Sequence, residues 1–118
     1  MTFNEPIPDF RTRFPDRLES CIATPFQSFG RKSLYQGLVS KATILFYLLV
    51  KNHPFQNGNK RIAITSLLTF LAINGKWLRI LQEDLYEITV IVAGSKPGIK
   101  NAMIAAIKET IQAFLVDA

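Results

Sequence analysis

The chain has 118 residues, of which 48% are hydrophobic and 19% are charged, and it contains no low-complexity tract. This composition excludes intrinsic disorder and predicts one globular domain over residues 1–118. The net charge of +5 favours an anionic partner. The charges are scattered, however, and they lack the basic and aromatic pattern of a nucleic-acid platform, so we expect no direct nucleic-acid partner.

The single cysteine, Cys21, has no partner for an internal disulfide, and one cysteine with one histidine does not complete a zinc site. This usage fits a reducing cytoplasm. No apolar run approaches the roughly 20 residues of a membrane span, and the N-terminus lacks the pattern of a signal peptide. We therefore expect a cytoplasmic protein that makes no membrane contact.

Residues 1–15 carry three prolines and show no hydrophobic period, which predicts an extended N-terminal lead-in that wraps the domain. Asp16 and Glu19 have the spacing of a capping box, so they predict a short helix to about Ala23 that begins after Asp16. Prolines and glycines then interrupt residues 24–37, where we expect a loop or a small hairpin.

Hydrophobic residues at three-to-four spacing predict four further helices. They cover residues 38–52, 62–74, 82–93 and 99–115. Asn74-Gly75 predicts a left-handed end to the second of them, and residues 76–80 predict a short connector or strand. The predicted fold class is all-α, a helical bundle.

The sequence His-Pro-Phe-Gln-Asn-Gly-Asn-Lys-Arg, residues 53–61, joins the first two of these four helices. Gly58 and Asn59 mark the start of a helix, where the backbone amides and the macrodipole attract anions. Lys60 and Arg61 follow in the first turn, where the dipole disfavours each cation by about 0.3–1 kcal/mol. This pattern predicts that a bound anion, best matched by a phosphate chain, offsets the two positive charges.

His53 stands at the entrance of this loop, where an imidazole with a pKa near 6.5 can accept the proton of an attacking hydroxyl. Taken alone, each residue of the loop also fits an ordinary structural role. On spacing alone, a histidine before proline is more often a residue that caps a helix C-terminus than a general base, and Asn57-Gly58 is a common turn. Phe55 is best explained as a core anchor of the loop, and Lys60-Arg61 also fits a solvated surface.

Taken in order, His-Pro-Phe-x-x-Gly-Asn-Lys-Arg resembles the signature loop of the Fic/Doc family. Lys60, in place of a second glycine, is similar to the Doc (death-on-curing) branch. The resemblance extends to Tyr35-Gln36-Gly37 before the loop and to Phe70-Leu71-x-x-Asn74-Gly75 after it. It implies an all-α bundle with a short β-hairpin or loop as a flap.

The resemblance also implies roles for the loop residues. His53 would be the general base that activates a hydroxyl of the target protein, and Phe55 would fix the loop. Phosphate groups would be held by Gly58, Asn59, Lys60 and Arg61. The segment 25–37 would be the flap that aligns the target as an added strand.

The implied activity is that of a Doc-like toxin, which transfers a phosphoryl or nucleotidyl group from ATP to a hydroxyl of a cytoplasmic protein. Translation elongation factor Tu is a candidate target. Ile64 stands where AMP-transferring members typically have an arginine, which favours Doc-like phosphorylation or another transfer. No glutamate lies four residues after Ser or Thr, as it does in self-inhibiting members, so we expect a separate cognate antitoxin.

Asn57 departs from the family pattern, which has Asp or Glu there to bind Mg²⁺. An amide oxygen can ligate Mg²⁺ but brings no negative charge, and hard cations are held chiefly by carboxylates and phosphates. The alternative hypothesis is therefore a catalytically impaired member that acts as a nucleotide-binding or protein-binding module.

Overall fold

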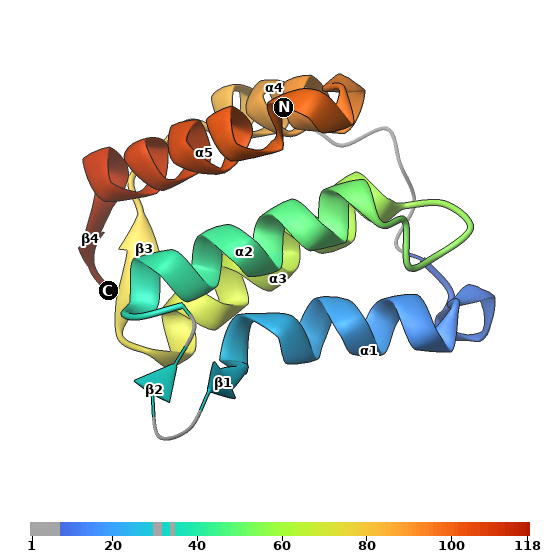
Figure 1. Ribbon diagram of the computed structural model, residues 1–118. Helices are drawn as coiled ribbons and strands as arrows, with labels where there is room; N and C mark the ends of the chain where they lie inside the picture. The colour runs from blue at the N-terminus through green and yellow to red at the C-terminus, as the bar shows by residue number, and fades with distance from the viewer. Residues whose placement is uncertain (1–7, 30–31, 34) are drawn as a thin grey trace.

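Two long antiparallel helices, α2 (Leu38–Lys51) and α3 (Asn59–Ile73), form the centre of the computed structural model (Figure 1). The structure describes residues 8–29, 32–33 and 35–118. The side chains between the two helices are largely buried, with Phe46 and Leu49 of α2 and Leu67 and Leu71 of α3 at most 2% exposed. Burial of these large apolar side chains holds α2 and α3 together. It thereby stabilises the positions from which residues 52–58 join the two helices.

Further helices cover both sides of this pair, so the fold has three layers (Figure 1). On one side lies α1 (Pro15–Ala23), and on the other lie α4 (Gln82–Gly94) and α5 (Lys100–Phe114). Short 3-10 turns precede α1, follow α1 and precede α5; they are η1 (Phe10–Thr12), η2 (Thr24–Phe26) and η3 (Pro97–Ile99). The predicted helical fold class is confirmed.

Within the part of the chain that the structure describes, two small antiparallel sheets complete the fold. In the first, β1 (Ser28–Phe29) pairs with β2 (Lys32–Ser33), which confirms the small hairpin expected between α1 and α2. In the second, β3 (Lys76–Leu78) pairs with β4 (Leu115–Asp117), with Trp77 opposite Val116. Two parts of the predictions, residues 1–7 of the lead-in and residues 30, 31 and 34 of the hairpin segment, lie outside the described residues.

The C-terminal strand has no counterpart in the sequence pattern. The apolar spacing predicts a helix to Leu115, but α5 ends at Phe114 and the next three residues pair with β3. The amide of Arg79 donates to the carbonyl of Phe114 at 2.9 Å, and Lys76 forms an ion pair with Asp117. These contacts join residues far apart in the sequence, so no local pattern announces them.

The capping box expected at α1 is wrong. The helix begins at Pro15, its N-cap is Phe14, and Asp16 lies inside the first turn without a capping hydrogen bond. Proline is favoured at the first helical position because its φ is already helical. Phe14 also donates its amide to the carbonyl of Pro54 at 2.6 Å, which holds the residue before the helix in an extended conformation.

The second central helix begins where Gly58 and Asn59 predict, three residues before the apolar pattern that starts at Ile62, and it ends as predicted. Its first residue is Asn59, so Lys60 and Arg61 belong to its first turn. It ends at Ile73, and Gly75 has a φ of 75°, the left-handed conformation predicted for this turn. None of the described helices combines the length and the apolar character required to cross a membrane.

Candidate functional site

His53 occupies an unusual backbone conformation at the end of α2. Its φ is 46°, which is uncommon for a residue with a side chain, and the following proline prevents the helix from continuing. The imidazole is exposed. It neither donates nor accepts a hydrogen bond within the part of the chain that the structure describes. The alternative of an imidazole that caps helix carbonyls is therefore not seen, and the ring faces solvent at the loop entrance.

The loop after His53 is held by the side chain of Asn59. This amide is 7% exposed and makes two hydrogen bonds to one residue. The Phe55 amide donates to Asn59 Oδ1 at 3.0 Å, and Asn59 Nδ2 donates to the Phe55 carbonyl at 2.9 Å. Phe55 itself is 5% exposed. Asn59 therefore positions the loop, a task that sequence reasoning missed; its binding to phosphate stays a prediction.

Gly58 makes the tight entry into α3. Its φ of 74° and ψ of 14° are left-handed, a conformation that costs a residue with a Cβ about 1–2 kcal/mol. The first intrahelical bond runs from the amide of Ile62 to the Gly58 carbonyl at 3.0 Å. No acidic residue stands in the first turn, where Lys60 and Arg61 are the second and third helical residues. The macrodipole and two cations thus combine at one helix end.

The N-terminal lead-in contacts the loop directly, which its sequence did not indicate. Arg13 forms an isolated antiparallel bridge with Phe55, next to the hydrogen bond between the Phe14 amide and the Pro54 carbonyl. The lead-in is therefore a short backbone support behind the residues that follow His53.

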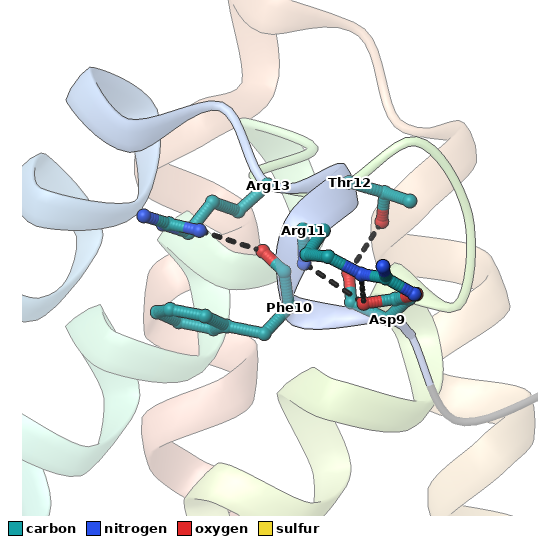
Figure 2. A network of polar contacts seen from close by, with 5 residues as sticks. All are labelled: Asp9, Phe10, Arg11, Thr12 and Arg13. Atoms are coloured by element: carbon teal, nitrogen blue, oxygen red, sulfur yellow. Dashed lines mark hydrogen bonds and ion pairs between the residues drawn. The ribbon is translucent and has the colours of Figure 1, made fainter.

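A local network gives the lead-in its shape (Figure 2). Asp9 Oδ1 accepts from the Arg11 amide at 2.9 Å, and Asp9 Oδ2 pairs with the Arg11 guanidinium at 3.0 Å. Arg13 donates to the Phe10 carbonyl at 3.0 Å, and its guanidinium carbon lies 4.0 Å from the Phe10 ring centroid. The Arg11 side chain lowers the pKa of Asp9, which stays an acceptor at neutral pH. The spacing of Asp9 and Arg11 is a local sequence signal for this turn. The sequence gives no signal for the contact between the lead-in and the loop.

The end of α2 before His53 is fastened to two other helices. Lys51 Nζ donates to the carbonyls of Ala93 and Ser95 at the end of α4, at 3.3 and 2.5 Å. Asn52 Nδ2 lies 3.8 Å from the sulfur of Cys21 in α1. Cys21 is fully buried, and burial raises the pKa of its thiol, so it remains neutral. These contacts fix the point at which the loop leaves α2.

Asn57 is exposed near the tip of the loop. Over residues 8–29, 32–33 and 35–118, no three His, Cys, Asp or Glu side chains gather in a group that could hold a metal ion. Mg²⁺ is usually held by one or two carboxylates together with phosphates of the substrate, so Asn57 as its ligand stays a prediction.

The hairpin does not lie near His53. It precedes the first residue of α2, whereas the loop follows the last residue, and α2 has 14 residues. At 1.5 Å per residue, α2 is about 21 Å long. Figure 1 shows β1–β2 and the α2–α3 loop at opposite ends of this helix. The structure thus brings His53, Phe55 and residues 57–61 together but leaves the expected flap at the other end of α2.

Comparisons with known proteins support the family resemblance of residues 53–61. A model of the Fic/DOC family matches residues 2–71, more than half of the chain. The Toxin Doc of Mycolicibacterium smegmatis is 38% identical over 58 residues, which are 49% of this chain and 45% of that toxin. The chain thus spans about half the length of this curated relative. No solved structure matches the chain.

Proposed function

The chain belongs to the Fic/DOC family, and on this basis we propose that it is a Doc-type toxin that transfers a phosphoryl or nucleotidyl group from ATP to a hydroxyl of a cytoplasmic protein. One observation carries the proposal. The exposed imidazole of His53 stands at the entrance of a loop that leads into a helix N-terminus with Lys60 and Arg61 in its first turn. A proton acceptor and a phosphate-binding helix end are the two parts that phosphate transfer requires.

In the proposed reaction, His53 takes the proton from the target hydroxyl as its oxygen attacks phosphorus. The new bond joins that oxygen to phosphorus, and the bond from phosphorus to the leaving phosphate oxygen breaks. Lys60 and Arg61, with the N-terminus of α3, oppose the charge of the phosphates. Asn59 holds the Phe55 backbone, so the loop between base and helix keeps its geometry.

The proposal assigns few protein ligands to Mg²⁺. The amide oxygen of Asn57 is a possible ligand, but the described residues supply no cluster of carboxylates, and we assign no step to the metal. Phosphates of the nucleotide would have to supply most of its ligands.

The proposed partners follow from the relative that is named as a toxin. We infer a cognate antitoxin that neutralises the chain, and a cytoplasmic target protein, with elongation factor Tu as a first substrate to assay. Direct binding to nucleic acid and contact with a membrane are not part of the proposal.

Parallel incubation with γ-labelled and α-labelled ATP tests the transfer. Purified elongation factor Tu and cell lysate are the substrates, and we expect label on a protein band. Transfer of γ-label identifies phosphorylation, and transfer of α-label identifies AMP addition. His53→Ala should lower the rate at least about 100-fold, since general-base catalysis contributes about 10²–10⁴-fold. An unchanged rate would contradict the role of His53.

A second candidate function, a nucleotide-binding module without transfer, is favoured by Asn57. Here neither label moves in the wild-type chain, while ATP still binds in an equilibrium dialysis assay. Asn57→Asp then decides the cause. Restored transfer in this variant would show that the missing carboxylate had removed catalysis, and the absence of transfer in both proteins would reject the enzymatic proposal.

A further inference from the structure

A cleft with apolar and polar lining residues lies between α2 and α5, and it is lined by none of residues 53–61. Its volume is about 380 Å³, within the range of small-ligand pockets. Ser40, Thr43 and Tyr47 of α2 face Lys100, Asn101 and Lys108 of α5 across it. Among the described residues, its lining contains two lysines and no aspartate or glutamate, so the charged side chains that line it there are cations.

Tyr47 is the unexplained group in this cleft. The residue is only 4% exposed, yet its hydroxyl has no hydrogen-bond partner among the residues that the structure describes. Thr43, which is 1% exposed in the same lining, differs because its hydroxyl donates to the Val39 carbonyl at 2.7 Å. Buried polar groups are nearly always paired, and an exception calls for a cause such as a ligand. Burial raises the pKa of Tyr47, so the phenol keeps its proton and can donate.

A positive charge lies over the ring of Tyr47. Lys100 Nζ is 5.9 Å from the centroid of the Tyr47 ring, and Lys100 is the first residue of α5, where the helix dipole adds positive potential. Lys108 follows in the same cleft two helical turns later. Ile44, Leu48 and Ile104 supply an apolar wall. A buried donor, two cations and an apolar wall together match a ligand with an acidic head and an apolar body.

We propose that the cleft between α2 and α5 binds a small organic anion. Its carboxylate or phosphate accepts a hydrogen bond from the Tyr47 hydroxyl and pairs with Lys100, and its apolar body lies against Ile44, Leu48 and Ile104. This site is separate from the loop at residues 53–61, and it does not depend on the proposed transfer reaction.

Titration of the whole chain followed by NMR chemical shifts tests the proposal. The probes are phenyl phosphate, benzoate and, as a neutral control of similar shape, benzyl alcohol. We expect saturable shifts for at least one anion at Tyr47, Lys100 and Asn101, and at least tenfold weaker binding of the alcohol. The tighter anion identifies the acidic head. The proposal is overturned if neither anion saturates, or if the alcohol binds as tightly as the anions.

Two variants with matched controls locate the binding. Tyr47→Phe and Lys100→Gln should each weaken the tighter anion about tenfold, because each removes a charge-assisted contact. Tyr86→Phe and Lys96→Gln, which change the same residue types outside the cleft, should leave the affinity unchanged. Equal affinity in wild type, Tyr47→Phe and Lys100→Gln would overturn the proposal.

The melting temperature of Tyr47→Phe gives an independent readout. The substitution removes one oxygen and keeps the ring, so it should not lower the melting temperature when the hydroxyl has no partner in the protein. A clearly lower melting temperature would show that the hydroxyl is already paired, and it would overturn the assignment of this donor to a ligand.

Discussion

Asn59 and Tyr47 are buried to nearly the same degree, 7% and 4% exposed, but their polar groups are in opposite situations. The Asn59 amide bonds to the backbone of Phe55, whereas the Tyr47 hydroxyl meets no partner among the described residues. A satisfied buried group stabilises one conformation of the chain, and an unsatisfied one costs stability until something binds it. The comparison therefore separates a residue that shapes a site from one that is available to a ligand.

Removal of the Asn59 side chain should give the largest effect. Asn59→Ala leaves both the amide and the carbonyl of Phe55 unpaired, so we expect a loss of about 2–4 kcal/mol in the free energy of unfolding. Urea denaturation followed by circular dichroism measures it. Asn57→Ala is the matched control, because this asparagine is exposed, and it should change stability by less than about 0.5 kcal/mol. Equal losses in both variants would refute the positioning role.

The next largest effect concerns the backbone support from the lead-in. Phe14→Pro removes the amide that donates to Pro54, whereas Phe14→Ala removes the aromatic ring and keeps that amide. We expect the proline variant to be less stable than the alanine variant by about 1 kcal/mol, the net contribution of one hydrogen bond. The same denaturation assay measures the difference. Identical stability would mean that the lead-in contributes nothing to holding the loop.

A smaller effect is expected for a polar pair at the surface, between Lys76 of β3 and Asp117 of β4. The hydrogen bond and the charge of Lys76 lower the pKa of Asp117 below its ordinary value of 3.8. The pair therefore stabilises the fold above that value, and its contribution is lost as the pH falls through the lower pKa of the folded state. Solvent screening keeps the contribution small.

Melting temperatures between pH 2 and pH 7 measure this contribution. Wild type should melt above Asp117→Asn at pH 7, and the two should converge as the pH falls below 4. A constant difference over the whole range would show that the ion pair is not its source.

The smallest effect on stability is expected for substitution of Tyr47, the unpaired residue of the comparison with Asn59. Tyr47→Phe should change the free energy of unfolding by no more than about 0.5 kcal/mol, or raise it slightly, because no intramolecular hydrogen bond is lost. The contrast with Asn59→Ala, measured under one set of conditions, is the sharpest form of the comparison. Losses of similar size would erase the distinction between the two residues.

Much of the fold could be read from local patterns. Apolar spacing located the four helices after residue 37, and Asn74-Gly75 marked the left-handed end of α3. The predictions were wrong where contacts between distant segments determine the local structure. Asp16 lost its capping role because Phe14 docks on Pro54, and Leu115 left the helix because β3 presents a strand edge. Contacts between residues far apart in sequence leave no periodic signal.

For the candidate site, too, some features follow from the sequence and others only from the tertiary structure. The order of residues from His53 to Arg61 determined, without any structure, the likeness of the loop to the Fic/DOC family, because charge and residue type are local properties. Phosphate binding by this loop stays a prediction. Only the tertiary structure decided that Asn59 clamps Phe55, that the lead-in supports the loop, that the hairpin lies at the far end of α2, and that Tyr47 faces Lys100 across a cleft. Burial and pairing are properties of the packed chain, and they arise when separate segments meet.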